Sequence, residues 1–260
     1  MLVLKQIFDL YIKSSLHVAF AIFSFVKVVE LSLNISSNVF LELAIFSGSV
    51  LGYSVLKYYE FWKSTKFSIN KNKSVLGITT IAFLTFVFCF FQLKFSFQIA
   101  FLQIFFLVVL YPFLRKYWFL KIAVVSFCVT YVVSYIPTLD TKMLFFFDTI
   151  LQVKLFFLIC ALLIPFEIYD SKHDAITLQT IPQKFGVKKT KYLGYLFLIC
   201  FCILSLLLQY EILDIVIAIL IAIVIGLFIR FSSTKNTKYY TSFWVESIPI
   251  LWWILVLIFN

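Results

Sequence analysis

The chain has 260 residues, of which 63% are hydrophobic and only 13% are charged, and its mean hydropathy is +1.05. Soluble globular domains contain about 25% charged residues, so this composition excludes a soluble protein and predicts an all-α integral membrane protein. The net charge is +10, but the basic residues are spread between apolar segments and form no nucleic-acid-reading motif. We therefore expect the chain to partner with a lipid bilayer and with no nucleic acid.

Nine apolar segments follow one another along the chain. The hydrocarbon core of a bilayer requires roughly 20 apolar residues per helix, and each segment comes close to that length. We expect about nine transmembrane helices packed into a single domain that covers residues 1–260. The segments are residues 15–33, 39–56, 75–93, 97–112, 118–136, 144–166, 192–209, 212–231 and 243–259.

The basic residues between these segments predict how the chain crosses the membrane. If the N-terminus is cytoplasmic, the outer loops hold only Lys94 and Lys142 and the inner loops hold almost all other basic residues. We expect an N-terminus inside and a C-terminus outside, in a bacterial cytoplasmic membrane. The inner basic residues are Lys5, Lys13, Lys57, Lys63, Lys66, Lys71, Lys73, Arg115, Lys116, Lys121, Lys172, Lys184, Lys188, Lys189, Lys191, Arg230, Lys235 and Lys238.

Two of the inner loops are long, at about residues 57–74 and 167–191. Long loops on one face, after the second and sixth spans, are typical of a cytoplasmic cap over the opening of a cavity. A transporter built from inverted repeats would show interrupted helices at matching places in its two halves, and the sequence shows no such pair. A small-solute transporter therefore ranks last among the functions that we consider.

The loop after the sixth span begins with a series of acidic residues. If the span continues as a helix, Glu167, Asp170 and Asp174 lie at positions i, i+3 and i+7 on one face. Like charges at such spacing repel by roughly 0.2–0.5 kcal/mol per pair. A solvated loop tolerates that cost, and a bound Mg²⁺ reverses it, because hard oxygen ligands suit this ion. The spacing alone leaves both interpretations open.

The acidic segment resembles the second aspartate motif of the UbiA family of intramembrane prenyltransferases. That motif is D-x-x-x-D followed by a Thr, a Pro and a Gly, which correspond here to Asp170, Asp174, Thr180, Pro182 and Gly186. The glycine usually found between the second aspartate and the threonine is missing, and the spacing is about one residue short.

Two further features resemble the same family. Residues 111–117, Tyr-Pro-Phe-Leu-Arg-Lys-Tyr, are similar to the Tyr-Pro-x-x-Lys-Arg segment at the inner end of its fourth helix. The expected architecture is also similar, with nine spans, an N-terminus inside and large cytoplasmic loops after spans two and six. The motif resemblance covers about thirty residues, whereas the topology covers nearly the whole chain.

The chain departs from the family in the first aspartate motif, an Asn followed by Asp at +4 and +8. Ser54, Tyr58 and Trp62 stand at those three positions in the best register. Glu60 is the only carboxylate in the segment and is out of register, while Lys57 adds positive charge. At most one half of a two-motif metal site is therefore present.

The resemblance implies transfer of an isoprenoid group from its diphosphate to a lipophilic acceptor, in which metal ions and basic residues stabilise the leaving diphosphate. The metal is expected to be Mg²⁺. The implied ligands are Asp170 and Asp174, with Glu167 as a possible third, and the implied diphosphate contacts are Arg115, Lys116, Lys57 and Lys184. The alternative is a catalytically inactive relative that binds an isoprenoid or another lipid.

Several charged residues lie within the predicted spans, where an ionisable group costs at least about 2.5 kcal/mol. Lys27 and Glu30 are one turn apart near the outer end of span one, close to Glu42 of span two, so we expect a structural ion-pair cluster. Lys154 lies near the middle of span six, with Asp148 about two turns further out. Either a cavity-facing position or pairing with Glu30 or Glu42 would accommodate Lys154.

Overall fold

The computed structural model describes residues 2–63, 73–115, 117, 119–141, 145–172, 178–208 and 211–259. This part of the chain is helical and contains no strand. Six spans are single helices, whereas the fifth and the last are interrupted by short π-helical segments, η2 and η4. The single helices are α3 (Val39–Lys63), α4 (Lys73–Gln92), α5 (Phe95–Leu114), α8 (Phe145–Asp170), α9 (Ile181–Leu207) and α10 (Ile212–Phe231). The interrupted spans are α6 (Leu120–Thr130) with η2 (Tyr131–Tyr135) and α7 (Ile136–Thr138), and η4 (Tyr240–Val245) with α11 (Ile248–Phe259).

The number of spans agrees with the sequence prediction. In the described ranges, 8 helical segments are long and apolar enough to cross a membrane. A ninth span is formed if α1 (Leu2–Lys13) and α2 (Leu16–Ser32), which are bent by 62° at their junction, are taken together. The prediction of an all-α integral membrane protein with about nine spans is confirmed.

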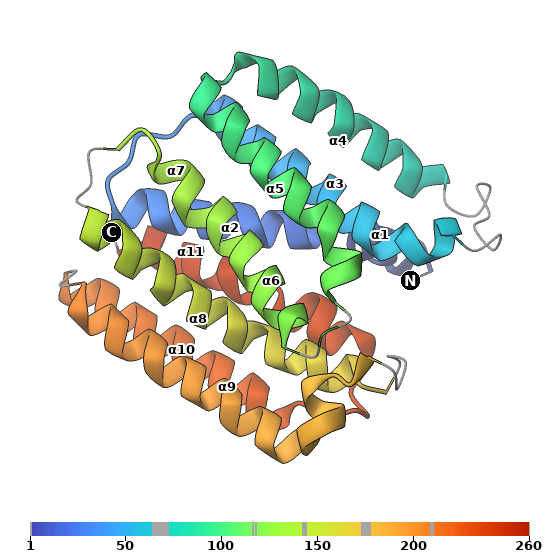
Figure 1. Ribbon diagram of the computed structural model, residues 1–260, viewed down its shortest axis with the longest axis vertical. Helices are drawn as coiled ribbons and strands as arrows, with labels where there is room; N and C mark the ends of the chain where they lie inside the picture. The colour runs from blue at the N-terminus through green and yellow to red at the C-terminus, as the bar shows by residue number, and fades with distance from the viewer. Residues whose placement is uncertain are drawn as a thin grey trace.

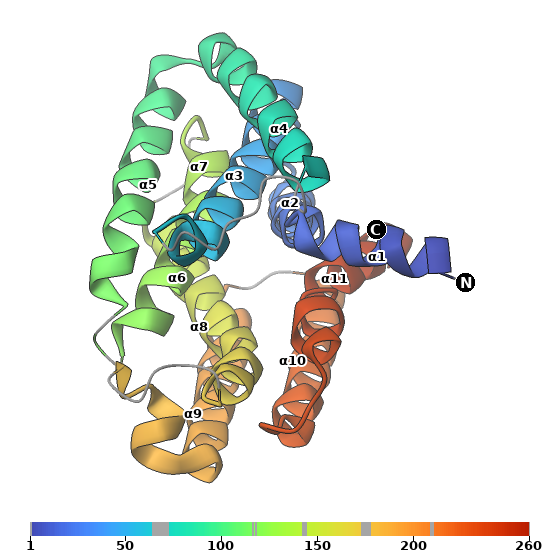
Figure 2. The same cartoon turned by 90° about the vertical axis from the view of Figure 1, so that its right-hand side faces the viewer.

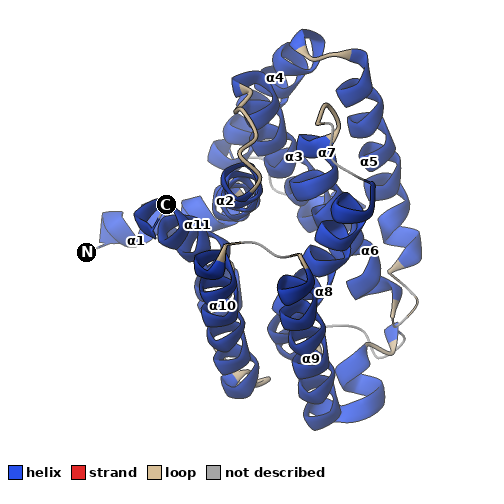
Figure 3. Ribbon diagram, turned by 90° about the vertical axis from the view of Figure 1, so that its left-hand side faces the viewer, coloured by secondary structure: helices blue, strands red, loops and turns tan. Residues whose placement is uncertain are grey.

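The helices lie side by side, and the two chain ends lie at opposite ends of the bundle (Figure 1). We call the end near the N-terminus the inner end, because the basic loops predict that it faces the cytoplasm. Figure 2 views the bundle from the inner end and Figure 3 from the outer end, and both show α10 and α11 on the side away from α4 and α5.

The core is formed by buried side chains of α2, α8, α9, α10 and α11, among other elements. Helix α2 packs against α3 and α11, and α8 packs against α6 and α9. Leu158, Phe201, Ile221 and Val256 are almost fully buried in this core. Large apolar side chains such as Phe91 are exposed on the outer helices, as expected of surfaces that contact lipid. Helix α6 packs against both α5 and α8 and so lies between these two helices in the bundle.

Three helix boundaries differ from the sequence prediction. Helix α1 was not predicted as a separate element, because only the apolar run that forms α2 was long enough to signal a span. Helix α9 begins at Ile181 rather than near residue 192, because its polar first turns lack the hydrophobicity of a span. Helix α8 ends at Asp170, so Glu167 and Asp170 lie on it, whereas Asp174 lies outside the described residues.

Candidate functional site at the inner ends of the helices

Glu167 and Asp170 lie in the last turn of α8, at the inner end of the bundle. The Ser171 amide donates to the Glu167 carbonyl oxygen (3.0 Å), and the Ser171 hydroxyl donates to the Ile168 carbonyl oxygen (2.8 Å). The Gln183 side chain of α9 donates to the Ser171 carbonyl oxygen at 3.2 Å. These bonds satisfy carbonyl groups at the helix end and fix the position of the two acidic residues.

Lys121, in the first turn of α6, provides the positive charge that faces these acids. Its Nζ lies 2.9 Å from Oε1 of Glu167 and 3.9 Å from Oδ2 of Asp170. The side chains of Lys121 and Glu167 are only 12% and 5% exposed, whereas that of Asp170 is 44% exposed. Because a buried carboxylate needs a partner, Lys121 and Glu167 form a buried ion pair, with Asp170 at its more accessible edge.

Lys121 opposes a Mg²⁺ ion bound by Glu167 and Asp170, because its charge has the same sign as that of the ion. Two unit charges of like sign 4 Å apart repel by about 4 kcal/mol at an effective dielectric constant of about 20, and a divalent ion beside Lys121 doubles that cost. The described residues also contain no group of three or more His, Cys, Asp or Glu side chains arranged to hold a metal. Asp174 lies outside the described ranges, so its predicted part in a metal site stays a prediction.

The basic segment after α5 begins at the same end of the bundle. Arg115 is the C-cap of α5, where its amide donates to the Tyr111 carbonyl oxygen at 2.9 Å, and it is half-buried. Figure 1 shows the end of α5, the start of α6 and the end of α8 at the same end of the bundle. Arg115 and Lys121 therefore bring two positive charges to the inner end that holds Glu167 and Asp170. Lys116, the other basic residue predicted here, is not among the described residues.

Lys57 stabilises a helix end. Its Nζ donates to the carbonyl oxygens of Ile12 and Lys13, both at 3.1 Å, and so caps the last turn of α1. Its charge also interacts with the Glu246 carboxylate at the end of η4. Lys57 thus connects α3 to α1 and to the last span. The sequence predicted Lys57 as a diphosphate contact and did not predict these contacts between helices.

Thr180, Pro182 and Gly186, which resemble the end of the second aspartate motif, form the start of α9. The Thr180 amide donates to the Gln183 side-chain oxygen at 3.0 Å, and Pro182 lies in the first turn. Gly186 has a φ of 80°, a left-handed conformation that favours glycine and bends the helix. Lys184, a predicted diphosphate contact, is exposed in this turn, with its Nζ 5.6 Å from the centre of the Phe185 ring.

The sequence did not predict the contacts of two polar groups at the inner end. His17 is buried, and its ring nitrogens lie 3.0 Å from the Tyr11 hydroxyl and 3.0 Å from the Phe243 carbonyl oxygen. Tyr239 donates a hydrogen bond to Asp9 of α1. Both contacts join α1 to the last span. The nearby basic residues were recognised only as topology signals, which is why Lys121 was also missed.

The charged residues inside the spans lie in two places: some form a structural ion-pair cluster, and Lys154 lines a pocket. Lys27 Nζ lies 2.8 Å from carboxylate oxygens of both Glu30 and Glu42, as predicted for a structural ion-pair cluster. The Asp148 carboxylate accepts hydrogen bonds from Thr138 and Gln152 at 3.0 and 2.9 Å. These contacts account for the charges near the outer ends of the first, second and sixth spans.

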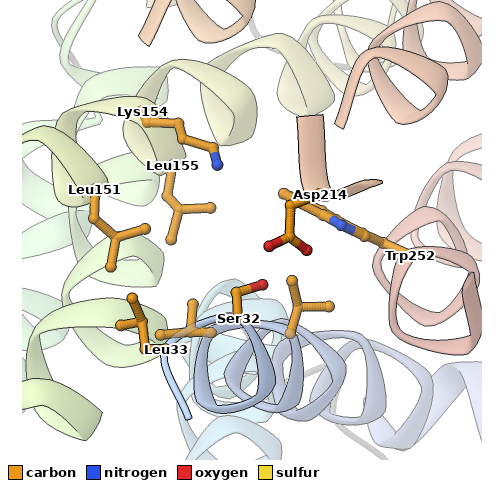
Figure 4. Close-up of a pocket in the computed structure, with 9 residues that line it drawn as sticks. Ser32, Leu33, Leu151, Lys154, Leu155, Asp214 and Trp252 are labelled. Carbon is orange, nitrogen blue, oxygen red and sulfur yellow. The ribbon is translucent and has the colours of Figure 1, made fainter. Parts of the chain in front are cut away.

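Lys154 lines a pocket nearer the outer end, together with Asp214, Ser32 and Trp252. Figure 4 shows the Lys154 ammonium, the Asp214 carboxylate and the Ser32 hydroxyl directed into one space. The Lys154 ammonium also lies 5.6 Å from the centre of the Phe201 ring, a cation–π arrangement. Of the two alternatives for Lys154, the structure shows the cavity-facing one.

Comparison with known proteins gives a likeness in fold. Neither the protein families nor the curated proteins provide a match to this sequence. A solved structure described as that of digeranylgeranylglyceryl phosphate synthase in membranes, a UbiA-type prenyltransferase, is similar with a TM-score of 0.59. The likeness covers 98% of this chain and 96% of that one, at 13% sequence identity. The chain therefore shares the fold of a membrane prenyltransferase along nearly its whole length.

Proposed function

We propose that the protein is a UbiA-like prenyltransferase that moves an isoprenoid group from its diphosphate to a lipophilic acceptor. The observation that carries this proposal is the likeness in fold to a membrane prenyltransferase over 98% of the chain. Arg115, at the end of α5, supports the proposal because it brings a guanidinium to the inner end that also holds Glu167 and Asp170. The bacterial cytoplasmic membrane is the proposed location.

The chemistry assigned to these residues is stabilisation of a leaving group. When the allylic carbon–oxygen bond breaks, negative charge develops on the diphosphate, and cationic donors in a site of low dielectric stabilise it most strongly there. Arg115 can present two parallel N–H donors to phosphate oxygens, and Lys184 offers a point charge in the first turn of α9. Lys116 is proposed to contribute from the connection that follows α5.

A catalytically inactive lipid-binding relative is the second candidate, and one observation favours it. Ser54 stands where the first motif requires Asn, and its hydroxyl donates to the Ser15 hydroxyl at 3.5 Å. Ser54 is buried at this contact between α3 and the start of α2. Ser54, at the first position of that motif, therefore packs between two helices instead of binding a metal ion. This is expected of a chain that keeps the fold but not the two-metal chemistry of the family.

The test is a transfer assay with the full chain in lipid vesicles. Radiolabelled geranylgeranyl diphosphate is supplied with lipid extract as the acceptor, and a prenyltransferase moves the label into a product that no longer carries diphosphate. Arg115→Gln should slow transfer by roughly 10- to 100-fold, because a charged hydrogen bond contributes about 1.5–3 kcal/mol. Arg230→Gln, which removes an exposed arginine at the inner end of α10, should leave the rate within about twofold.

Two results would contradict prenyl transfer. If the label binds saturably and is recovered unchanged, the lipid-binding candidate is favoured. If Arg115→Gln and wild type transfer the label at the same rate, the activity does not reside at the inner end of α5.

A further inference from the structure

We propose that the inner ends of α9 and α10 bind the headgroup of an anionic phospholipid from the cytoplasmic leaflet of the membrane. The surface consists of Lys188 and Lys189 in the early turns of α9 and of Arg230 in the last turn of α10, and we call it the basic patch. All three residues are exposed. The proposal goes beyond the proposed function, because lipid binding at the patch holds whether or not the chain transfers an isoprenoid.

The packing of α9 against α10 brings the three residues to one place. Gly194 lets the two helices approach closely, since a Cβ added there would lie only 2.9 Å from Cδ1 of Ile229. One turn earlier on α9, Lys191 Nζ donates to the carbonyl oxygen of Arg230 at 2.6 Å. This bond joins the inner ends of the two helices, so Lys188 and Lys189, within a turn of Lys191, lie beside the end of α10.

The segments that carry the basic patch contain no acidic residue. Neither residues 175–210 nor residues 215–245 include an Asp or a Glu. Other basic residues at the inner end make contacts within the protein, since Lys121 pairs with Glu167 and Lys57 caps the end of α1. The orientation of the chain requires basic residues on the inner side, but it does not require that they gather on two packed helices. Such a cluster attracts the anionic headgroups of the cytoplasmic leaflet.

The face of α9 that carries Lys189 continues towards the outer end as an exposed apolar stripe. Its residues follow at spacings of three and four, which places them on one side of the helix. They are Tyr192, Leu196, Ile199 and Ile203, all more than half exposed. A charged group at the inner end of this stripe therefore lies directly beside a surface that contacts lipid chains.

Helix α10 has the same arrangement. Arg230 lies at the inner end of a stripe with the same spacing, formed by Val216, Leu220, Ile223 and Leu227. A phospholipid matches both helices, because its phosphate can contact the basic patch while its acyl chains lie along the apolar stripes. A soluble anion or a nucleic acid would match the charges alone. The guanidinium of Arg230 is suited to the phosphate, since it can donate two parallel hydrogen bonds.

The experiment counts the lipids that remain bound to purified full-length protein. The protein in detergent is titrated with phosphatidylglycerol, which is anionic, or with phosphatidylcholine, which is zwitterionic, and native mass spectrometry measures the bound molecules. Both lipids carry the same acyl chains, so the comparison isolates the headgroup. Wild type should bind phosphatidylglycerol about tenfold more tightly or better, because basic residues near the membrane surface favour anionic lipids.

The test variant combines Lys188→Gln, Lys189→Gln and Arg230→Gln, and it should lose the preference for phosphatidylglycerol. All three substitutions are at exposed positions and keep a polar side chain of similar size.

The matched control removes the same number of exposed charges from other elements at the inner end. It combines Lys5→Gln in α1, Lys73→Gln in α4 and Lys172→Gln after α8, and it should keep the preference of wild type.

Three results would overturn the proposal. The first is equal binding of the two lipids by wild type, a comparison that is decisive even if the test variant fails to fold. The second is an equal loss of preference in the test variant and the control, which would assign the effect to total charge. The third is displacement of phosphatidylglycerol by millimolar inorganic phosphate, which would show a site for a free anion rather than for a lipid.

Discussion

At the scale of single residues, the inner site depends on one buried charge pair. Glu167 is nearly inaccessible, and Lys121, 2.9 Å away, stabilises its carboxylate there. Removing one partner of a buried pair leaves an uncompensated charge and costs about 3–5 kcal/mol, whereas exposed pairs contribute about 0–1 kcal/mol. The two kinds of ion pair in this chain are therefore expected to respond very differently to mutation.

Lys121→Ala should lower the free energy of unfolding by about 3 kcal/mol or more. Lys94→Ala, at the exposed Lys94–Asp140 pair, should change it by less than about 1 kcal/mol. Chemical denaturation in detergent, followed by tryptophan fluorescence, compares the two variants. Adding Glu167→Gln to Lys121→Ala should recover part of the loss, because the buried charge is then removed. If Lys121→Ala and Lys94→Ala lowered the free energy of unfolding equally, that result would contradict a buried Lys121–Glu167 pair.

At the scale of elements, the end of α8 and the start of α9 determine where the residues of the candidate site lie. Helix α8 ends at Asp170, and α9 starts at Ile181 and bends at Gly186, whose φ is 80°. The sequence predicted the acidic residues and the glycine from their resemblance to a motif. It did not predict the end of α8, because the polar residues after Asp170 are compatible with either a solvated helix or a turn.

Gly186→Ala should destabilise the protein by about 1 kcal/mol or more, because residues with a Cβ rarely adopt its left-handed backbone conformation. Gly77→Ala is the matched control: Gly77 lies within α4, and an added Cβ would meet no atom within 4 Å. That substitution should leave stability unchanged or raise it, since alanine favours helix. Thermal unfolding of both variants measures the difference. If Gly186→Ala did not lower the thermal stability, that result would contradict the bend at Gly186.

The contact of α1 with the last span predicts a dependence on pH. The hydrogen bond to Asp9 raises the pKa of Tyr239 above its ordinary value near 10. Because the folded-state pKa is raised, the contribution of this contact is fully present below about pH 10 and is lost as pH rises through the folded-state pKa. Tyrosinate absorbance, taken as the difference between wild type and Tyr239→Phe, measures this pKa. Asp9→Asn should return it towards 10, and an unchanged pKa would contradict the contact.

At the scale of the whole molecule, composition and charge predicted more of the fold than of the site. Apolar segments long enough to span a bilayer identified the membrane helices, because burial in lipid imposes a composition that any single sequence reveals. Lys121 was placed in an inner loop, but its pairing with Glu167 depends on how α6 packs against α8. Such long-range contacts leave no periodic signal in the sequence. For Lys154 the sequence offered a cavity-facing position as one of two alternatives, but it did not predict the residues that line the pocket with it.

The predicted orientation can be measured independently of activity. A reporter that is active only in the cytoplasm should work when fused to the N-terminus and fail when fused to the C-terminus, because an odd number of spans places the ends on opposite sides. A reporter active only outside should give the reverse pattern. Both ends on the same side would contradict the nine-span arrangement and would leave α1 and α2 as elements that do not cross the membrane together.

The most direct test of the proposed function is diphosphate release from geranylgeranyl diphosphate by the purified protein in vesicles that contain a lipophilic acceptor. The account predicts release in step with transfer of the label to lipid, with a rate that falls roughly 10- to 100-fold in Arg115→Gln and is unchanged in Arg230→Gln. Saturable binding without release, or release that is equal in wild type and Arg115→Gln, would contradict a prenyltransferase site at the inner ends of these helices.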